Sequence, residues 1–195
     1  MTLSLLSQSQ SQYQVRFDWG VAGARAISAD ADVLVWVDVL REASASPLSA
    51  LLPASPETQA LPAVTAIAGS LPNRSAVAQW ILDRQEAKGD RFVVAIVAAG
   101  AARDDGSARF AVEDLLAAGS IIDALAAVGI DFCSPEAAAA SAAFSGLRHA
   151  TGHLIGASGS GRELAEAGRR TEIKAAVAID SSDVVVVLRE FSSAE

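Results

Sequence analysis

The sequence predicts an α/β fold in which three layers, α/β/α, enclose a mostly parallel or mixed sheet. Short runs rich in valine, alanine and isoleucine, typical of strands buried on both faces of a sheet, alternate with segments of helical periodicity. At 195 residues, with 51% hydrophobic and only 5% aromatic residues, the chain is long enough to bury one mainly aliphatic core.

Segments with the strand pattern recur along the whole chain. YQVRFDWG (residues 13–20) is an expected strand closed by Gly20, and Asp30–Leu40 is a stronger one because its valine-rich centre is nearly continuous. The remaining expected strands are Pro62–Ser70, Asp90–Gly100 and Ser181–Phe191.

Helix signals stand between these strands. Asn73 is a good N-cap for an amphipathic helix over Arg74–Lys88, and a second helix is expected to begin near Val112. Residues 134–136, Ser-Pro-Glu, place an N-cap, a first-turn proline and a favourable charge before an alanine-rich helix. A short helix is expected over Ser160–Ala167.

The first residues differ from the rest in composition. Met1–Gln12 is rich in serine and glutamine without periodicity, so we expect a disordered lead to a single α/β domain over residues 13–195. The lead lacks the basic start and long apolar core of a signal peptide, and no apolar run approaches the roughly 18 residues of a membrane span. A lone Cys133 excludes an internal disulfide. These features predict a cytoplasmic protein with no membrane partner.

The charge balance limits the classes of ligand. A net charge of -8 argues against binding to nucleic acid, which requires clustered lysine and arginine. A small anionic ligand is compatible with this charge, because a local arginine cluster or a bound metal ion reverses the sign in one pocket.

Candidate site residues follow the predicted strands. In open α/β sheets ligands bind beyond the carboxyl ends of the strands, where loops and helix N-termini meet. A carboxylate within a valine-leucine run costs several kcal/mol unless it is paired or bound to metal, which favours a functional Asp38. The other candidates at such places are Arg41, Ser70, Asn73, Glu113, Asp114 and Arg162.

Structural explanations compete with each functional one. Glu113 and Asp114 complement the dipole of a helix that starts beside them, as readily as they bind a divalent metal. Asn73 is adequately explained as a helix cap, and Arg41 as an ion-pair partner. The turn before Arg162 resembles an anion-binding helix start, although it departs from the phosphate loop of an NTPase.

Seven segments stand in a distinctive order along the chain: DVLVWVDVLR, GSLPNRSAVA, VVAIVAAG, EDLLAAGSI, SPEAAAA, SGRELAEAG and AAVAIDSSDVVVVL. Taken together, these segments resemble the 2-phosphosulfolactate phosphatase family, the ComB-like proteins. The resemblance implies an α/β/α fold and a magnesium-dependent phosphatase that acts on a small anionic phosphoester. It implies catalytic roles for Asp38 and Arg41, metal binding by Glu113 and Asp114, and substrate binding by Ser70, Asn73 and Arg162.

The chain departs from this family between Glu42 and Ala68. Members usually carry a G-N-S-P stretch and a strand ending in T-N-G-T there, and this sequence holds neither. We therefore expect slow hydrolysis of 2-phosphosulfolactate, unless another copy in a homo-oligomer replaces the lost loops. The alternative is a noncatalytic ComB-like scaffold that binds a small anion or a partner subunit.

Overall fold

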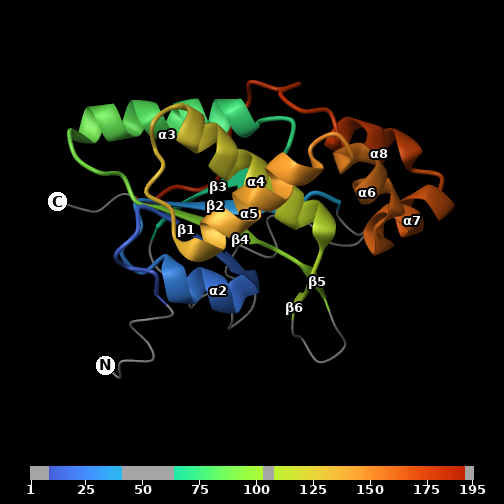
Figure 1. The fold of residues 1–195 in the computed structure, drawn as a ribbon, viewed down its shortest axis with the longest axis horizontal. Helices are drawn as coiled ribbons and strands as arrows, with labels where there is room; N and C mark the ends of the chain where they lie inside the picture. Colours follow the sequence, from blue (N-terminus) through green and yellow to red (C-terminus); the bar gives the residue numbers. More distant parts are fainter. Residues whose placement is uncertain (1–8, 41–63, 103–107, 192–195) are drawn as a thin grey trace.

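The computed structural model describes residues 9–40, 64–102 and 108–191, and its main sheet is mixed (Figure 1). The order of its strands is β1-β4-β2-β3-β7. The first four run parallel, and β7 is antiparallel to β3. Their bounds are β1 Val15–Trp19, β2 Val33–Val37, β3 Thr65–Gly69, β4 Val94–Ala98 and β7 Val186–Arg189.

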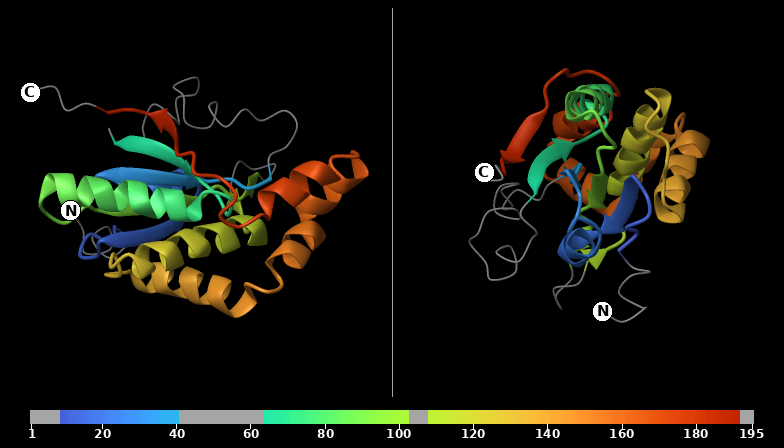
Figure 2. Two further views of the ribbon diagram at one scale, coloured as in Figure 1. Left: turned by 90° about the horizontal axis from the view of Figure 1, so that it is seen from above. Right: turned by 90° about the vertical axis from the view of Figure 1, so that its left-hand side faces the viewer.

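Helices cover both faces of this sheet, which gives the expected α/β architecture. Helix α2 packs on one face against β1 and β4, whereas α3 and α4 pack together on the other, with α5 against α4 and β1. Three shorter helices, α6 to α8, gather at one end of the molecule (Figure 2). The bounds are α2 Gly20–Ile27, α3 Arg74–Lys88, α4 Val112–Ala127, α5 Pro135–Leu147, α6 Thr151–Ala157, α7 Gly159–Glu166 and α8 Arg170–Ala176.

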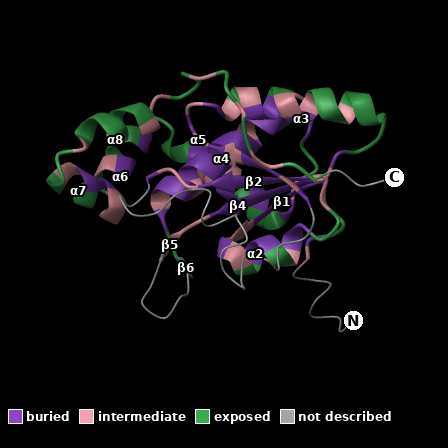
Figure 3. Ribbon diagram, turned by 180° about the vertical axis from the view of Figure 1, so that it is seen from behind, coloured by how far each residue is buried: buried purple, intermediate pink, exposed green. Residues whose placement is uncertain are grey.

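The alternation of side chains along the strands divides the core in two. In β2, Val33, Val35 and Val37 face the larger cluster beneath α3, α4 and α5. Leu34 and Trp36 face the smaller cluster beneath α2. Every residue of β2 is buried, as expected for a central strand covered on both faces (Figure 3).

Most expected elements are confirmed, and the helices α2, α6 and α8 are additional. Helices α3 and α4 begin where the sequence indicates, and Ser134 caps α5 by accepting a hydrogen bond from the Ala137 N–H. No clear local signal marks α2 or α8. Helix α2 carries two glycines and no side-chain cap, and α8 buries no residue, so neither shows a strong local pattern. The fold needs α2 because it covers the second face of the sheet.

Gln10, from the expected lead Met1–Gln12, forms hydrogen bonds with the edge strand β1. The Gln10 side chain accepts a hydrogen bond from the Phe17 N–H and donates one to the Phe17 carbonyl, as a neighbouring strand would. Such pairing satisfies edge groups that would otherwise be open to another chain. Within the three described ranges, no helix combines the length and apolarity required to cross a bilayer.

Close contact between α4 and α5 depends on Gly119. A Cβ at this position would lie 2.1 Å from the Ala140 carbonyl oxygen, which is far too close. Because that oxygen belongs to helix backbone, the two helices would have to separate to admit a methyl group. A Cβ added to Gly146, on α5, would have no neighbouring atom within 4 Å.

Gly119→Ala is therefore expected to destabilise the protein by about 1–3 kcal/mol, the usual range for overpacking of a core. Gly146→Ala serves as the matched control and should be neutral or slightly stabilising, since alanine is the better helix former. Denaturant unfolding of both variants measures the effect. Equal stabilities of the two variants would contradict the close helix contact.

Candidate active site

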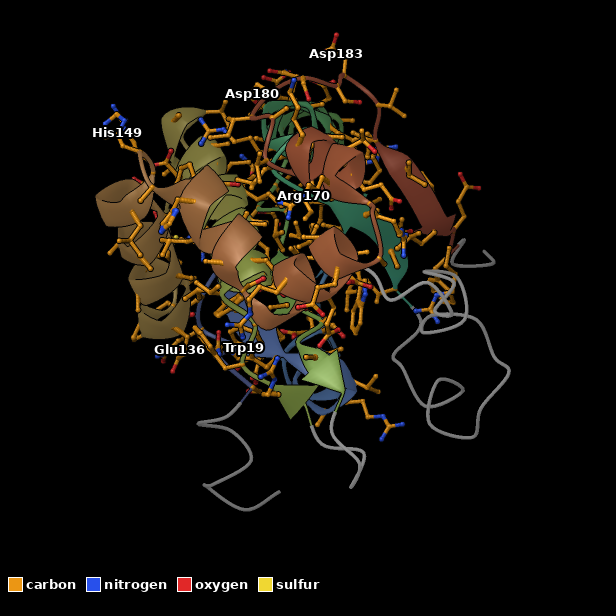
Figure 4. The ribbon with its side chains drawn as sticks, turned by 90° about the vertical axis from the view of Figure 1, so that its right-hand side faces the viewer. Trp19, Glu136, His149, Arg170, Asp180 and Asp183 are labelled. Atoms are coloured by element: carbon orange, nitrogen blue, oxygen red, sulfur yellow. The ribbon has the colours of Figure 1, made fainter. Side chains whose placement is uncertain are left out.

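A cleft of about 410 Å³ opens at the carboxyl ends of β2 and β3. Its floor includes Asp38 and Ser70, and its far wall comes from α7 and α8. This is the end of the molecule where α6 to α8 gather, seen face-on in Figure 4. The lining residues are Asp38, Val39, Leu40, Ser70, Pro72, Leu164, Glu172, Ala175 and Ala176.

Strand register brings Asp38 and Ser70 to neighbouring positions. Val37 pairs with Gly69 at the last rung of the parallel ladder between β2 and β3. The residue that follows each of these is Asp38 or Ser70, so both side chains leave the sheet at its carboxyl edge. Gly69 also permits close packing, because a Cβ there would lie 2.6 Å from Ile121 on α4.

Asn73 holds the loop that carries Ser70. Its Oδ1 accepts hydrogen bonds from the Ser70 N–H (2.9 Å) and the Ser70 hydroxyl (2.8 Å). Its Nδ2 donates to the carbonyls of Ala68 (3.2 Å) and Val184 (3.1 Å). The expected capping bond to α3 is not made, although Asn73 does occupy the cap position. These four bonds use the full capacity of the amide, which makes Asn73 a positioning residue for Ser70.

Asp114 forms hydrogen bonds to the backbone at the ends of two strands. Its carboxylate accepts the Val39 N–H, just after β2, and the Gly100 N–H, just after β4, both at 2.9 Å. The pKa of Asp114 is raised from 3.8 to about 8, mainly by burial, with a contribution from the nearby charges of Asp38 and Glu113 and against the lowering effect of the two backbone hydrogen bonds. The bonds to Asp114 fix the loop on which Asp38 stands.

Glu113 and Asp114 are not among the residues that line the cleft. They are only 3% and 2% exposed. Within the described part of the chain, no three or more His, Cys, Asp or Glu side chains converge to hold a metal ion. Magnesium is usually held by one or two carboxylates together with water and substrate phosphate, so Asp38 on the lining, with the charge of Asp114 nearby, fits its chemistry.

The protein without metal is expected to lose stability as the pH rises from about 5 to about 7, in part because of Asp114. A carboxyl with a raised pKa keeps its proton in the folded state after the unfolded chain has released its own, so rising pH favours unfolding between the two pKa values. Relative to Asp114→Asn, the wild type should lose roughly 2 kcal/mol more unfolding free energy over this interval.

Denaturant unfolding in the presence of a chelator, at both pH values, measures this difference. Asparagine changes the hydrogen bonds to Val39 and Gly100 equally at both pH values, so the comparison isolates the proton. Equal losses in the two proteins would mean that Asp114 is already ionised when folded.

The structure describes one of the two predicted site arginines. Arg41 lies outside the described residues. Arg162 is exposed on α7 and is not among the residues that line the cleft. The glycine-serine turn before it has structural reasons: Ser158 caps α7 through the Gly161 N–H, and a Cβ on Gly161 would lie 2.2 Å from the Ile155 carbonyl.

Sequence reasoning missed the wall of the cleft opposite Asp38. Leu164 comes from α7, and Glu172, Ala175 and Ala176 come from α8. Three of these residues lie within the matching segments SGRELAEAG and AAVAIDSSDVVVVL, but none was among the candidate site residues. Glu172 is paired with Arg169 through two short hydrogen bonds of 2.6 and 2.7 Å, which lower the pKa of Glu172.

A second, smaller cavity of about 270 Å³ lies at the end of β1. It is lined in part by Asp18, Trp19 and Glu136, and Figure 4 shows the last two side by side. Burial raises the pKa of Asp18, and the charge of Glu136 adds to that effect. The rule about strand ends that selected Asp38 would also have selected Asp18.

The comparison with known families agrees with the motifs. A family model described as 2-phosphosulpholactate phosphatase matches residues 56–190, well over half of the chain. The matched range contains β3, α4 and α7, and it begins after Asp38 and Arg41. No curated protein matches the chain. The extent of the family match shows that this chain belongs to the 2-phosphosulpholactate phosphatase family.

Proposed function

We propose that the protein is a magnesium-dependent phosphomonoester hydrolase whose active site is the cleft at the carboxyl ends of β2 and β3. One observation carries the proposal: Asp38 and Ser70 line the same cleft, and the buried Asp114 accepts the N–H of Val39, the residue next to Asp38. Family membership supports a phosphatase-like enzyme. The position supports the same conclusion, because α/β sheets bind ligands at this edge.

The acidic residues carry the metal in this proposal. Asp38 is its ligand on the cleft side, and Glu113 and Asp114 provide negative charge beneath. Magnesium bound there would polarise the phosphoryl oxygens and offset their negative charge. A divalent cation also relieves the repulsion among the three carboxylates that contributes to the raised pKa of Asp114.

The remaining residues bind and orient the phosphoester. The Ser70 hydroxyl, held by Asn73, faces the same cleft as Asp38 and can hydrogen-bond a phosphoryl oxygen. Arg41 and Arg162 are proposed to neutralise anionic charge on the substrate, with the planar fork that suits phosphate. Positioning of this kind supplies much of the rate of phosphoryl transfer.

The natural substrate is proposed to differ from 2-phosphosulfolactate. The stretch from Glu42 to Ala68 lacks the G-N-S-P and T-N-G-T segments that are usual in the family. Removing one aligned electrostatic donor can cost about a hundredfold in rate, and each lost loop can hold several. Hydrolysis of 2-phosphosulfolactate by this chain should therefore be slow.

Phosphate release from a panel of phosphomonoesters, with magnesium or with a chelator, tests the proposal. We expect magnesium-dependent release from at least one ester, and less from 2-phosphosulfolactate than from the preferred substrate. A chain that releases no phosphate from any ester, yet binds phosphate or a partner subunit, would favour the noncatalytic scaffold instead. The oligomeric state of the sample should be measured alongside.

A further inference from the structure

The segment between α8 and β7 packs against the loop that carries Ser70. It lies within AAVAIDSSDVVVVL, the last of the segments that resemble the family. The Asp180 N–H donates to the Leu71 carbonyl (3.2 Å), and the Ser182 N–H donates to the Pro72 carbonyl (3.0 Å). Figure 4 labels Asp180 in this segment. Two backbone hydrogen bonds therefore attach the segment to the residues that directly follow Ser70.

Asp180 caps helix α3 from a distant part of the sequence. Its Oδ1 accepts the backbone N–H of Ser75, the second residue of that helix, at 3.1 Å. Its Oδ2 accepts a hydrogen bond from Arg74 Nε at 3.1 Å, and Arg74 also donates to Asp123 on α4 at 3.2 Å. Burial raises the pKa of Asp180, but the hydrogen bonds from Ser75 and Arg74 outweigh burial, so this pKa lies below its ordinary value. An ionised carboxylate at this place also complements the dipole of α3.

The backbone of Asp180 is adapted to this contact. It adopts a left-handed conformation (φ 52°), which is uncommon for a residue that carries a side chain. Aspartate tolerates this conformation better than most residues, because its short polar side chain can form hydrogen bonds nearby. Such a conformation persists where the surrounding contacts fix it. The contacts of Asp180 with Leu71, Arg74 and Ser75 provide that support.

The cap supplied by Asp180 explains why Asn73 does not cap α3 itself. An asparagine at the N-cap position normally accepts the N–H of the second or third helical residue. In α3 the Ser75 N–H, the first of these two, already has Asp180 as its acceptor. The Asn73 Oδ1 accepts the N–H and the hydroxyl of Ser70 instead. These two uses of Oδ1 compete, because an amide oxygen has two lone pairs and Ser70 takes both.

We infer that Asp180 is a positioning residue of the cleft, because it caps α3 in place of Asn73 and so leaves Asn73 to hold Ser70. The importance of this for turnover rests on the proposed function, in which the Ser70 hydroxyl binds the phosphoryl group. Without the Asp180 carboxylate, Asn73 would turn to the Ser75 N–H, as an ordinary N-cap does. The helix would then remain capped, whereas Ser70 would lose its fixed orientation.

Three variants separate this role from a general contribution to stability. Asp180→Gly removes the carboxylate and suits the left-handed backbone. Asp180→Asn tolerates the same backbone and keeps an oxygen for the Ser75 N–H, so it should restore most of the wild-type behaviour. Asp123→Ala is the matched control. It removes the other carboxylate that Arg74 contacts, at a position on α4 that does not line the cleft.

Exchange of backbone amides with water, measured by NMR on the full chain, reports on both hydrogen bonds. In Asp180→Gly the Ser70 N–H should exchange about tenfold faster than in the wild type, whereas exchange at Ser75 should change little because Asn73 now accepts that N–H. For the best phosphomonoester, kcat should fall about tenfold with a smaller change in KM, since the lost contact orients the phosphoryl group. Asp123→Ala should match the wild type in both measurements.

The outcomes separate this inference from the hydrolase proposal. Faster exchange at Ser70 in Asp180→Gly, in a protein that hydrolyses no ester, would overturn the hydrolase and support the hold of Asp180 on Ser70. Unchanged exchange at Ser70 in that variant would overturn the inference, whether or not esters are hydrolysed. Equal changes in Asp180→Gly and Asp123→Ala, or an unchanged kcat of Asp180→Gly in an active enzyme, would also overturn it.

Discussion

Asp38→Asn is expected to lower kcat/KM for the best phosphomonoester by about a hundredfold or more, with the fold intact. Asp38 is the acid that follows the central strand β2 and reaches the cleft. Asparagine keeps the size and one oxygen of the side chain but removes its charge. In the proposed site that charge holds magnesium, so its loss should also weaken the dependence of the rate on magnesium.

The matched control is Asp83→Asn, which removes a carboxylate from an exposed position on α3. Its side chain accepts a hydrogen bond from Gln79 on the same helix and does not line the cleft, so activity should be unaffected. Circular dichroism and thermal melting establish that both variants are folded. Full activity in Asp38→Asn would remove Asp38 from the reaction and leave it as the end of a strand.

Arg16→Met is expected to cost about 1–3 kcal/mol of unfolding free energy, the usual penalty for leaving a buried hydrogen-bonding group without its partner. Arg16 stands on β1 and is only 1% exposed. Its guanidinium donates to the carbonyls of Tyr13 (3.0 Å), Ile27 (2.9 Å) and Ser11 (3.1 Å). It also forms a bidentate ion pair with Asp30, which lowers the pKa of the Asp30 carboxyl.

One arginine thereby joins β1 to the end of α2 and to the segment before the sheet. Methionine fills similar volume but leaves three carbonyl groups without their donor, and each unmet buried group costs about 1–3 kcal/mol. Arg169→Met is the matched control, because it breaks a similarly short ion pair at the exposed start of α8, where solvent screening should leave stability almost unchanged. Equal losses in the two variants, by denaturant unfolding, would contradict the structural role of Arg16.

The fold was predictable where local and tertiary signals coincide. Helix α3 carries a strong helical pattern that ends at Gly89, which adopts a left-handed conformation (φ 67°), and the structure ends the helix there. Helix α2 opens with a left-handed Gly20 (φ 62°), and a Cβ on Gly23 would lie 2.7 Å from the Asp18 side chain. Its glycines indicate a turn to any local analysis, whereas close packing on β1 makes them part of a helix.

The site was predictable on one side only. Asp38 and Ser70 follow strands directly, so the geometry of a parallel sheet brings them together from sequence alone. The opposite wall comes from α7 and α8, which are distant in sequence from Asp38. The matching segments SGRELAEAG and AAVAIDSSDVVVVL overlap these helices, but nothing in them indicates that Leu164 or Ala175 faces Asp38, so this wall could be found only from the fold. The hydrogen bonds of Asn73 and Asp114 likewise depend on partners such as Val184 and Gly100 that spacing does not reveal.

The central claim is that magnesium and phosphate meet in the cleft at Asp38. A crystal structure with manganese in place of magnesium tests this most directly, because manganese gives an anomalous signal. The crystal should also contain butylphosphonate, a non-hydrolysable analogue of a phosphomonoester. We predict an anomalous peak at about 2.0–2.2 Å from an Asp38 carboxylate oxygen, the range for a hard divalent cation, with the phosphonate beside Ser70. A peak in the cavity between Asp18 and Glu136, or manganese bound only on the surface, would contradict the account.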